Sequence, residues 1–182
     1  MRSGTRPEMH YYALSLSLPE STPRTSTVSL IVRTFAAQDP YNEERIVYRT
    51  SPYAVDFYNY HRWAASPAQQ TTDWTVQYLR ASGLFAKVLP IANTKADYVL
   101  HGIIRQFEEI DADNRWDATL TLDLWLTRDV ERTPFWTQSY TSTQTAAKRA
   151  PEAVAAAMSH CLEDILQRLT ADLATVIASN AP

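Results

Sequence analysis

The chain has 182 residues, 45% hydrophobic and 20% charged, which suits one globular domain and excludes a chain that is disordered by composition. Its net charge of −3 lacks the excess of lysine and arginine that binding to the phosphate backbone of nucleic acid normally demands, so we predict no nucleic-acid partner. No apolar run is long enough to cross a bilayer as a helix.

Residue patterns in the first third of the chain indicate β-strands. Alternating apolar residues over 11–18 predict one strand, a proline-bearing polar loop follows over 19–27, and VSLIVRTF at 28–35 predicts a second strand. The runs IVYRT and YAVDFYNY predict a hairpin that turns at Ser51-Pro52, because proline fixes φ and cannot donate to a strand ladder.

A helix is predicted to begin at Ser66-Pro67. Serine is a good cap, proline fits the first helical position, and Gln69 follows the serine at the spacing of a capping box. The helix is expected to end at Gly83, which suits a left-handed C-terminal residue.

The second half of the chain predicts a short strand in FAKVLPI, a long hairpin joined by DADNR, and a polar edge strand in FWTQSYTSTQT. From Pro151, apolar residues recur at three- and four-residue spacing and predict a long amphipathic helix. The order predicts an α+β fold, with a mixed, mostly antiparallel sheet and two helices packed on one of its faces.

Aromatic residues concentrate between Ile46 and Pro67. We considered a stacking surface for nucleic acid, a pocket for an apolar ligand, and strands that lie half in the core and half against a partner. The net charge weakens the first interpretation, and ordinary core packing competes with the other two. The residues predicted to bind a partner are Tyr48, Tyr53, Tyr58, Tyr60, Trp63 and Trp125.

No residue pattern predicts catalysis. With three glycines no phosphate-binding loop can be written, the four histidines have no paired spacing, and no G-x-S-x-G elbow is present. The single cysteine, Cys161, lies on the apolar stripe of the last predicted helix and is expected to be a buried, inert thiol. We therefore predict a protein that is not an enzyme, with no catalytic residue, no cofactor and no metal.

Several motifs together resemble a known family. They are HYYALSLSL, the I-V-Y-R run at Ile46–Arg49 with R-W-A-x-x-P at Arg62–Pro67, the S-G-x-F-x-x-V turn at Ser82–Val88, and ADYVLHGIIRQFEE. In this order they resemble the ABC-type transport auxiliary lipoproteins that work with MCE-type systems, the group that includes PqiC.

The resemblance implies a lipid transport role. Its members act with an MCE-domain protein and an ABC permease, and an N-terminal lipid anchor holds them at the periplasmic face of the outer membrane. The printed sequence has no lipobox cysteine, so we expect residues 1–9 to be the linker that follows it and 10–180 to form the single auxiliary domain. A homo-oligomer is a further expectation.

Two other functions remain as alternatives. A periplasmic adaptor or activator of a cell-envelope complex fits the same kind of scaffold. A carrier of apolar ligands would need a cavity of several hundred Å3, on the order of known ligand pockets, between the helices and the sheet.

Overall fold

The computed structural model describes residues 7–20, 26–90, 95–112, 114–128, 131 and 133–179. The strands are β1 His10–Tyr12, β2 Ser29–Val32, β3 Ala36–Ala37, β4 Arg45–Ser51, β5 Ala54–Trp63, β6 Lys87–Pro90, β7 Tyr98–Ala112, β8 Arg115–Arg128 and β9 Trp136–Thr145, and the helices are α1 Pro67–Ala81 and α2 Pro151–Ser179. Parts of the predicted segments lie outside the described residues: 1–6 of the linker, 21–25 of the polar loop, Ile91, Asp113 and residue 180 at the end of the domain.

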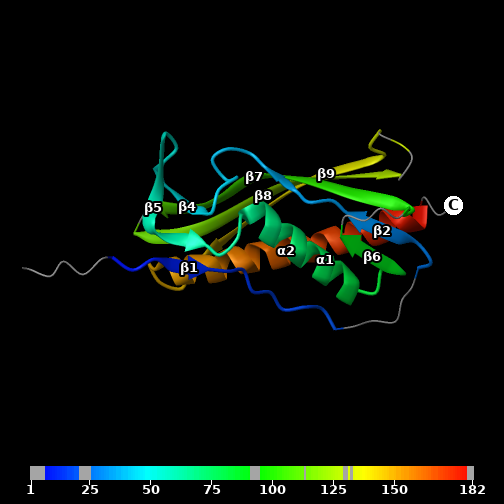
Figure 1. The fold of residues 1–182 in the computed structure, drawn as a ribbon, viewed down its shortest axis with the longest axis horizontal. Helices are drawn as coiled ribbons and strands as arrows, with labels where there is room; N and C mark the ends of the chain where they lie inside the picture. Colours follow the sequence, from blue (N-terminus) through cyan, green and yellow to red (C-terminus); the bar gives the residue numbers. More distant parts are fainter. Residues whose placement is uncertain are drawn as a thin grey trace, which may run out of the picture.

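One mixed sheet is covered on one face by both helices, as the sequence predicted (Figure 1). The long β7–β8–β9 meander is antiparallel, β4 and β5 form an antiparallel hairpin, and β1, β2, β3, β4 and β6 also make parallel pairs. The helix α2 packs on β8 and β9, and α1 packs beside it on β2, β3, β6 and β7. We call the other side of the sheet the helix-free face.

The core lies between the helices and the sheet. Along β8 the predicted face of alternating residues is fully buried, and the apolar stripe of α2 packs against it. Burial of this many aliphatic side chains is the main stabilising term, at roughly 1.5–3 kcal/mol for each. The β8 members of this core are Ala118, Leu120, Leu122, Leu124 and Leu126.

The helix α1 begins and ends as predicted. The Ser66 hydroxyl accepts a 3.3 Å hydrogen bond from the Gln69 backbone N–H, while the Gln69 side chain bonds Asp73 instead of returning to the cap. Only half of the predicted capping box therefore forms. Gly83 follows the helix with φ of 68°, in the left-handed region expected of a C-terminal glycine.

The first predicted strand is mostly wrong. Only His10–Tyr12 joins the sheet, and the chain then lies against the helices. There the Leu14 backbone N–H donates to the Gln70 side chain and its carbonyl accepts from Trp74 Nε1, so helix side chains satisfy polar groups that a strand ladder would have satisfied. Leu14 and Leu16 are buried as the alternation predicted.

A β-bulge in β7 separates two registers. Ile104 pairs with Leu122 and Gln106 with Thr121, which leaves Arg105 as the extra residue. Because a one-residue shift exchanges the two faces of a strand, Phe107 enters the core and Gln106 lies on the helix-free face.

Gly102 in β7 lies where backbone and side chains approach closely. A Cβ placed there would be 2.7 Å from both Leu124 Cδ2 and Phe35 Cδ1. We expect Gly102→Ala to lower the free energy of unfolding by about 1–3 kcal/mol through overpacking, measured by urea denaturation. The exposed Gln138→Ala in β9 is the control, expected to change it by less than about 0.5 kcal/mol. Equal values for the two variants would show that this core tolerates the added methyl group.

Candidate functional site

The β4–β5 hairpin stands out from the body of the molecule at one end (Figure 1). Its turn forms at Pro52 and Tyr53, one residue after the predicted Ser51-Pro52, and Arg49 donates from Nη1 to the Pro52 carbonyl at 3.3 Å. Tyr53 at the tip is 97% exposed, which leaves nearly the whole ring in water. An exposed ring at the tip of a projecting hairpin is typical of a contact surface.

One side of β5 has no partner strand among the described residues. The strand β1 pairs in parallel only with His61–Trp63, and β4 occupies the opposite side. Residues 54–60, which we call the hairpin edge, therefore lack a partner strand on this side, although the Phe57 backbone N–H donates to the Asp56 carboxylate at 2.7 Å. Two exposed apolar side chains lie on this edge, Val55 at 40% and Tyr60 at 47%.

An aromatic cluster supports the base of the hairpin. The Tyr58 ring lies 4.9 Å from Tyr48, 5.5 Å from His61 and 6.3 Å from Trp116. His61 in turn stacks on His10, and a 2.8 Å hydrogen bond joins its Nδ1 to the Tyr12 hydroxyl. Burial and the neighbouring His10 lower the pKa of His61, which favours its neutral form.

A buried carboxylate lies beneath this cluster. The Tyr58 hydroxyl lies 3.0 Å from both carboxylate oxygens of Glu109, which is on the helix side of β7. Burial raises the pKa of Glu109 to about 7; Asp111 also raises it, while the Tyr58 hydrogen bond and Arg149 lower it. Burial also raises the pKa of Tyr58, so the phenol remains the donor.

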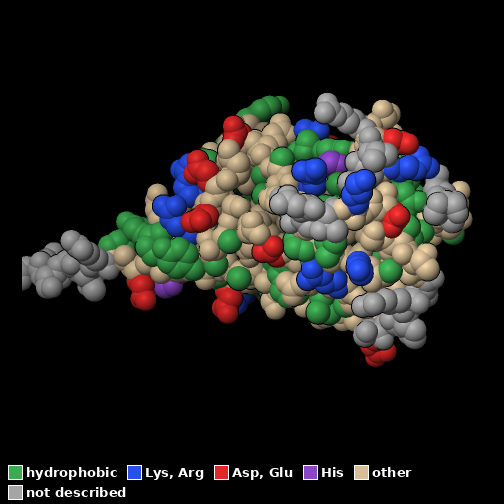
Figure 2. Space-filling view, turned by 45° about the vertical axis from the view of Figure 1, so that its right-hand side comes forward, with side chains coloured by type: hydrophobic (Ala, Val, Ile, Leu, Met, Phe, Trp, Pro, Cys, Tyr) green, Lys and Arg blue, Asp and Glu red, His purple; other side chains and the backbone are tan. Residues whose placement is uncertain are grey.

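The six predicted contact residues fall into four places: the surface of the hairpin, its base, the core and the helix-free face. Tyr53 and Tyr60 lie on the surface of the hairpin, and Tyr48 and Tyr58 are half-buried at its base. Hydrophobic side chains gather at this end of the molecule (Figure 2).

Trp63 is a core residue. It is 1% exposed, and its ring meets Phe107 edge-on at 5.1 Å. Trp63 is the last residue of β5, where the strand lies within the body of the sheet, and the indole points into the core. The prediction that Trp63 is a contact residue on the surface is therefore wrong.

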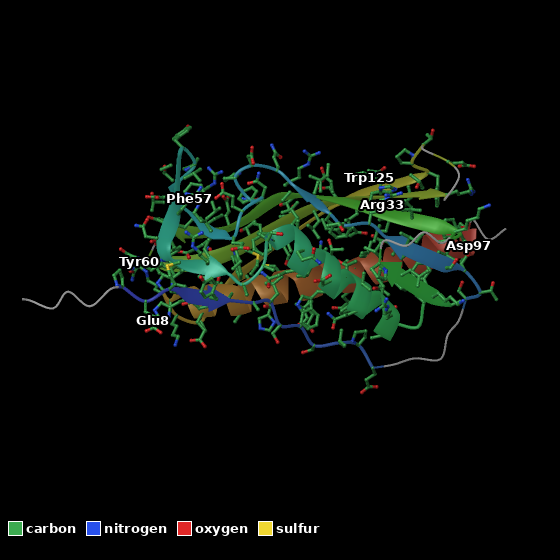
Figure 3. The ribbon with its side chains drawn as sticks, viewed as in Figure 1. Glu8, Arg33, Phe57, Tyr60, Asp97 and Trp125 are labelled. Carbon is green, nitrogen blue, oxygen red and sulfur yellow. The ribbon has the colours of Figure 1, made fainter. Side chains whose placement is uncertain are left out.

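Trp125 lies on the helix-free face, far along the sheet from Tyr60 (Figure 3). It stacks on His101 with a 5.3 Å ring separation and a 4° interplanar angle, which leaves the indole partly exposed. Burial and Arg33 lower the pKa of His101. Trp125 therefore belongs to a different surface from the hairpin.

Sequence reasoning missed Tyr11, which is 62% exposed beside β5, and the buried pair of Tyr58 with Glu109. The alternation of apolar residues at Tyr12 and Leu14 indicates that Tyr11 faces outward, so the sequence contains a signal for its exposure. The contact with β5 depends on pairing between segments about fifty residues apart, for which the sequence carries no local signal.

The buried side chains between the helices and the sheet form the hydrophobic core, and a groove of about 730 Å3 opens on the helix-free face beside the hairpin. Cys161 lies in that core with its thiol 3.3 Å from the Ala118 carbonyl, and burial raises the thiol pKa to about 12.

Among the described residues, no three histidine, cysteine, aspartate or glutamate side chains gather where a metal ion would bind. The described helices include none that is both long and apolar enough to span a membrane. What the geometry offers is an open strand edge with exposed rings on a domain of α+β class.

The comparisons identify the family. The family model of the ABC-type transport auxiliary lipoprotein component matches residues 12–174, so the chain belongs to that family. This is a family of transport components and not a known enzyme family, and its lipoprotein character indicates association with the cell envelope.

Solved structures share the fold. The Xanthomonas campestris protein XCC0632 is 23% identical with a TM-score of 0.83, over 93% of this chain and 98% of that one. The Chlamydia trachomatis hypothetical protein CT253 is 8% identical with a TM-score of 0.55, over 85% of this chain and all of that one. The comparison with curated proteins gives no match.

The buried Glu109 predicts a pH dependence of stability. Its folded pKa of about 7 exceeds the ordinary value of 4.5, so between these pH values the folded chain keeps a proton that the unfolded chain releases. The free energy of unfolding should therefore fall by about 1–3 kcal/mol as pH rises from 4.5 to 7.

Glu109→Gln should remove this part of the pH dependence, because the amide does not titrate and its oxygen still accepts from Tyr58. Thermal unfolding at pH 4.5, 6 and 8 measures it. The exposed Glu8→Gln is the control and should follow the parent chain. A Glu109→Gln profile parallel to that of the parent would contradict a raised pKa.

Proposed function

We propose that the chain is a non-enzymatic component of an MCE-type ABC transport system. It docks or tethers the periplasmic MCE-domain protein at the periplasmic face of the outer membrane, and the ABC permease of the same system completes the assembly. The assembly moves phospholipids or other apolar molecules between membranes. Family membership supports the transport role, and the resemblance of the sequence motifs supports the MCE partner.

The single observation that carries the docking role is the open hairpin edge at residues 54–60. An edge of this length offers main-chain hydrogen bonds to an added strand, and alternate side chains give selectivity. Only one charged residue, Asp56, interrupts the aromatic and small side chains of the edge. Natural edges are usually protected by lysine, proline or a covering element, so an exposed aromatic edge fits one that is covered by a partner.

The path of the N-terminal segment is consistent with a tether. His10 pairs with His61 at the base of the hairpin, so the chain enters the fold at the end that carries the docking surface (Figure 1). A lipid anchor ahead of the domain would hold this end toward the membrane. A homo-oligomer using the same edge is compatible with this arrangement.

We expect the double variant Tyr53→Ser, Tyr60→Ser to weaken binding to the MCE-domain protein of the same system by at least about tenfold. Both rings are exposed, so the change removes contact area with little effect on folding. Immobilised MCE-domain protein and the purified chain in biolayer interferometry give the affinity, and thermal unfolding checks the fold.

The control is Leu18→Ser, because Leu18 is as exposed as Tyr60, at 47% each, but lies outside the hairpin. Trp125→Ala tests the other predicted contact. Unchanged affinity in the double variant, with a loss in Trp125→Ala, would place the docking surface on the helix-free face instead.

A further inference from the structure

The groove on the helix-free face lies between the turn of the hairpin, the loop that carries Tyr41, and the bulged part of β7. Its volume of about 730 Å3 is in the range of small-molecule sites, which run from roughly 300 to 1,000 Å3. It is lined by Tyr41, Arg49, Thr50, Ser51, Pro52, Arg105, Gln106, Glu108, Ile110, Ala112 and Thr121.

The floor of the groove is a network of polar side chains that hydrogen-bond to one another. Glu108 is 2% exposed, and its carboxylate accepts from Arg49 Nε at 2.7 and 2.8 Å, from the Tyr41 hydroxyl at 2.7 Å and from Gln106 Nε2 at 2.7 Å. These donors occupy both oxygens of the carboxylate. Burial raises the pKa of Tyr41 to about 12, so its hydroxyl remains a donor.

Because the charges of Arg49 and Glu108 compensate each other, a ligand that covers the floor needs neither a charge nor a polar group at that point. Around it lie the apolar groups of Pro52, Ile110 and Ala112. An apolar chain lying over this network would leave the Glu108 carboxylate with all of these partners, which lowers the cost of removing water from the floor.

The rim is different because it carries a cation. Arg105, the extra residue of the bulge, is 46% exposed in its side chain, and its Nε donates to Asp123 at 2.6 Å. A guanidinium has five N–H donors, so one such bond leaves others for an anion. Asp123 compensates the charge of Arg105 but is not part of the lining, so within the groove the guanidinium is the charged member of this ion pair.

We propose that this groove binds an amphiphile with one apolar chain and one anionic head group, the chain lying over the Glu108 network and the head group at Arg105. The head group is a carboxylate or a phosphate, as in a fatty acid or a single-chain phospholipid. The groove and the hairpin edge are different surfaces, so this inference does not depend on the docking role.

The test uses the purified chain and three probes that share one apolar chain: dodecanoate, dodecyl phosphate and dodecanol, each below its aggregation concentration. Titration with intrinsic fluorescence and isothermal calorimetry measures stoichiometry and affinity. We expect one site per chain, with at least one of the anions at least fivefold tighter than dodecanol. The better of the two anions identifies the head group.

Two variants fill the groove. Thr121→Trp lies at its floor and Ala112→Phe at its mouth, and each should weaken binding of the preferred anion at least tenfold. The matched control is Thr137→Trp, which adds the same ring to the same face outside the lining. Ala112 is exposed, so Ala112→Phe keeps the test valid if Thr121→Trp unfolds.

Arg105→Gln should weaken anion binding at least fivefold and leave dodecanol binding unchanged. Arg33→Gln, an exposed arginine of the same face that does not line the groove, should change neither (Figure 3). The proposal is overturned if no probe binds saturably, if filling the groove has no effect, or if dodecanol binds as tightly as both anions.

Discussion

The arrangement of every surface on this domain depends on the β-bulge at Arg105. The strand β7 pairs with β2, β3, β4 and β8, so its register is transmitted through most of the sheet. Without the extra residue, Gln106 and Glu108 would face the helices, and Phe107 would face water. With it, Phe107 supports Trp63 in the core, Glu108 forms the floor of a groove, and Glu109 lies beneath Tyr58. Two adjacent glutamates therefore take different roles on opposite faces of one strand.

The core and the proposed functional surfaces are physically separate. The leucine face of β8 and the stripe of α2 form a close-packed layer, in which large changes of shape are costly. The hairpin extends beyond this layer, and its outer half contributes only partly buried rings to the core. Changes on the hairpin edge are thus expected to alter binding with little cost to folding, whereas changes at Trp63 or Gly102 act on the fold.

Much of this fold could be predicted from the sequence. The α+β class, the β4–β5 hairpin, the polar edge strand β9 and the ends of α1 follow from local signals: alternation, a proline turn, a serine cap and a glycine stop. The path of residues 13–18 could not, because its partners are side chains of Gln70, Trp74 and Ser159 in the helices. Trp63 was misassigned because the aromatic run was considered as a unit, although only its first part leaves the sheet. The bulge does leave a trace, since apolar positions in YVLHGIIRQF change parity after Ile104.

The central claim is that the hairpin edge is the docking surface for the MCE-domain protein. Hydrogen–deuterium exchange of the full chain, with and without that partner, tests it most directly, because strand addition gives the exposed amides of the edge new hydrogen bonds. We expect slower exchange over residues 54–60 in the complex, with little change on α2. Protection confined to other elements, with exchange at the hairpin unaltered, would contradict it.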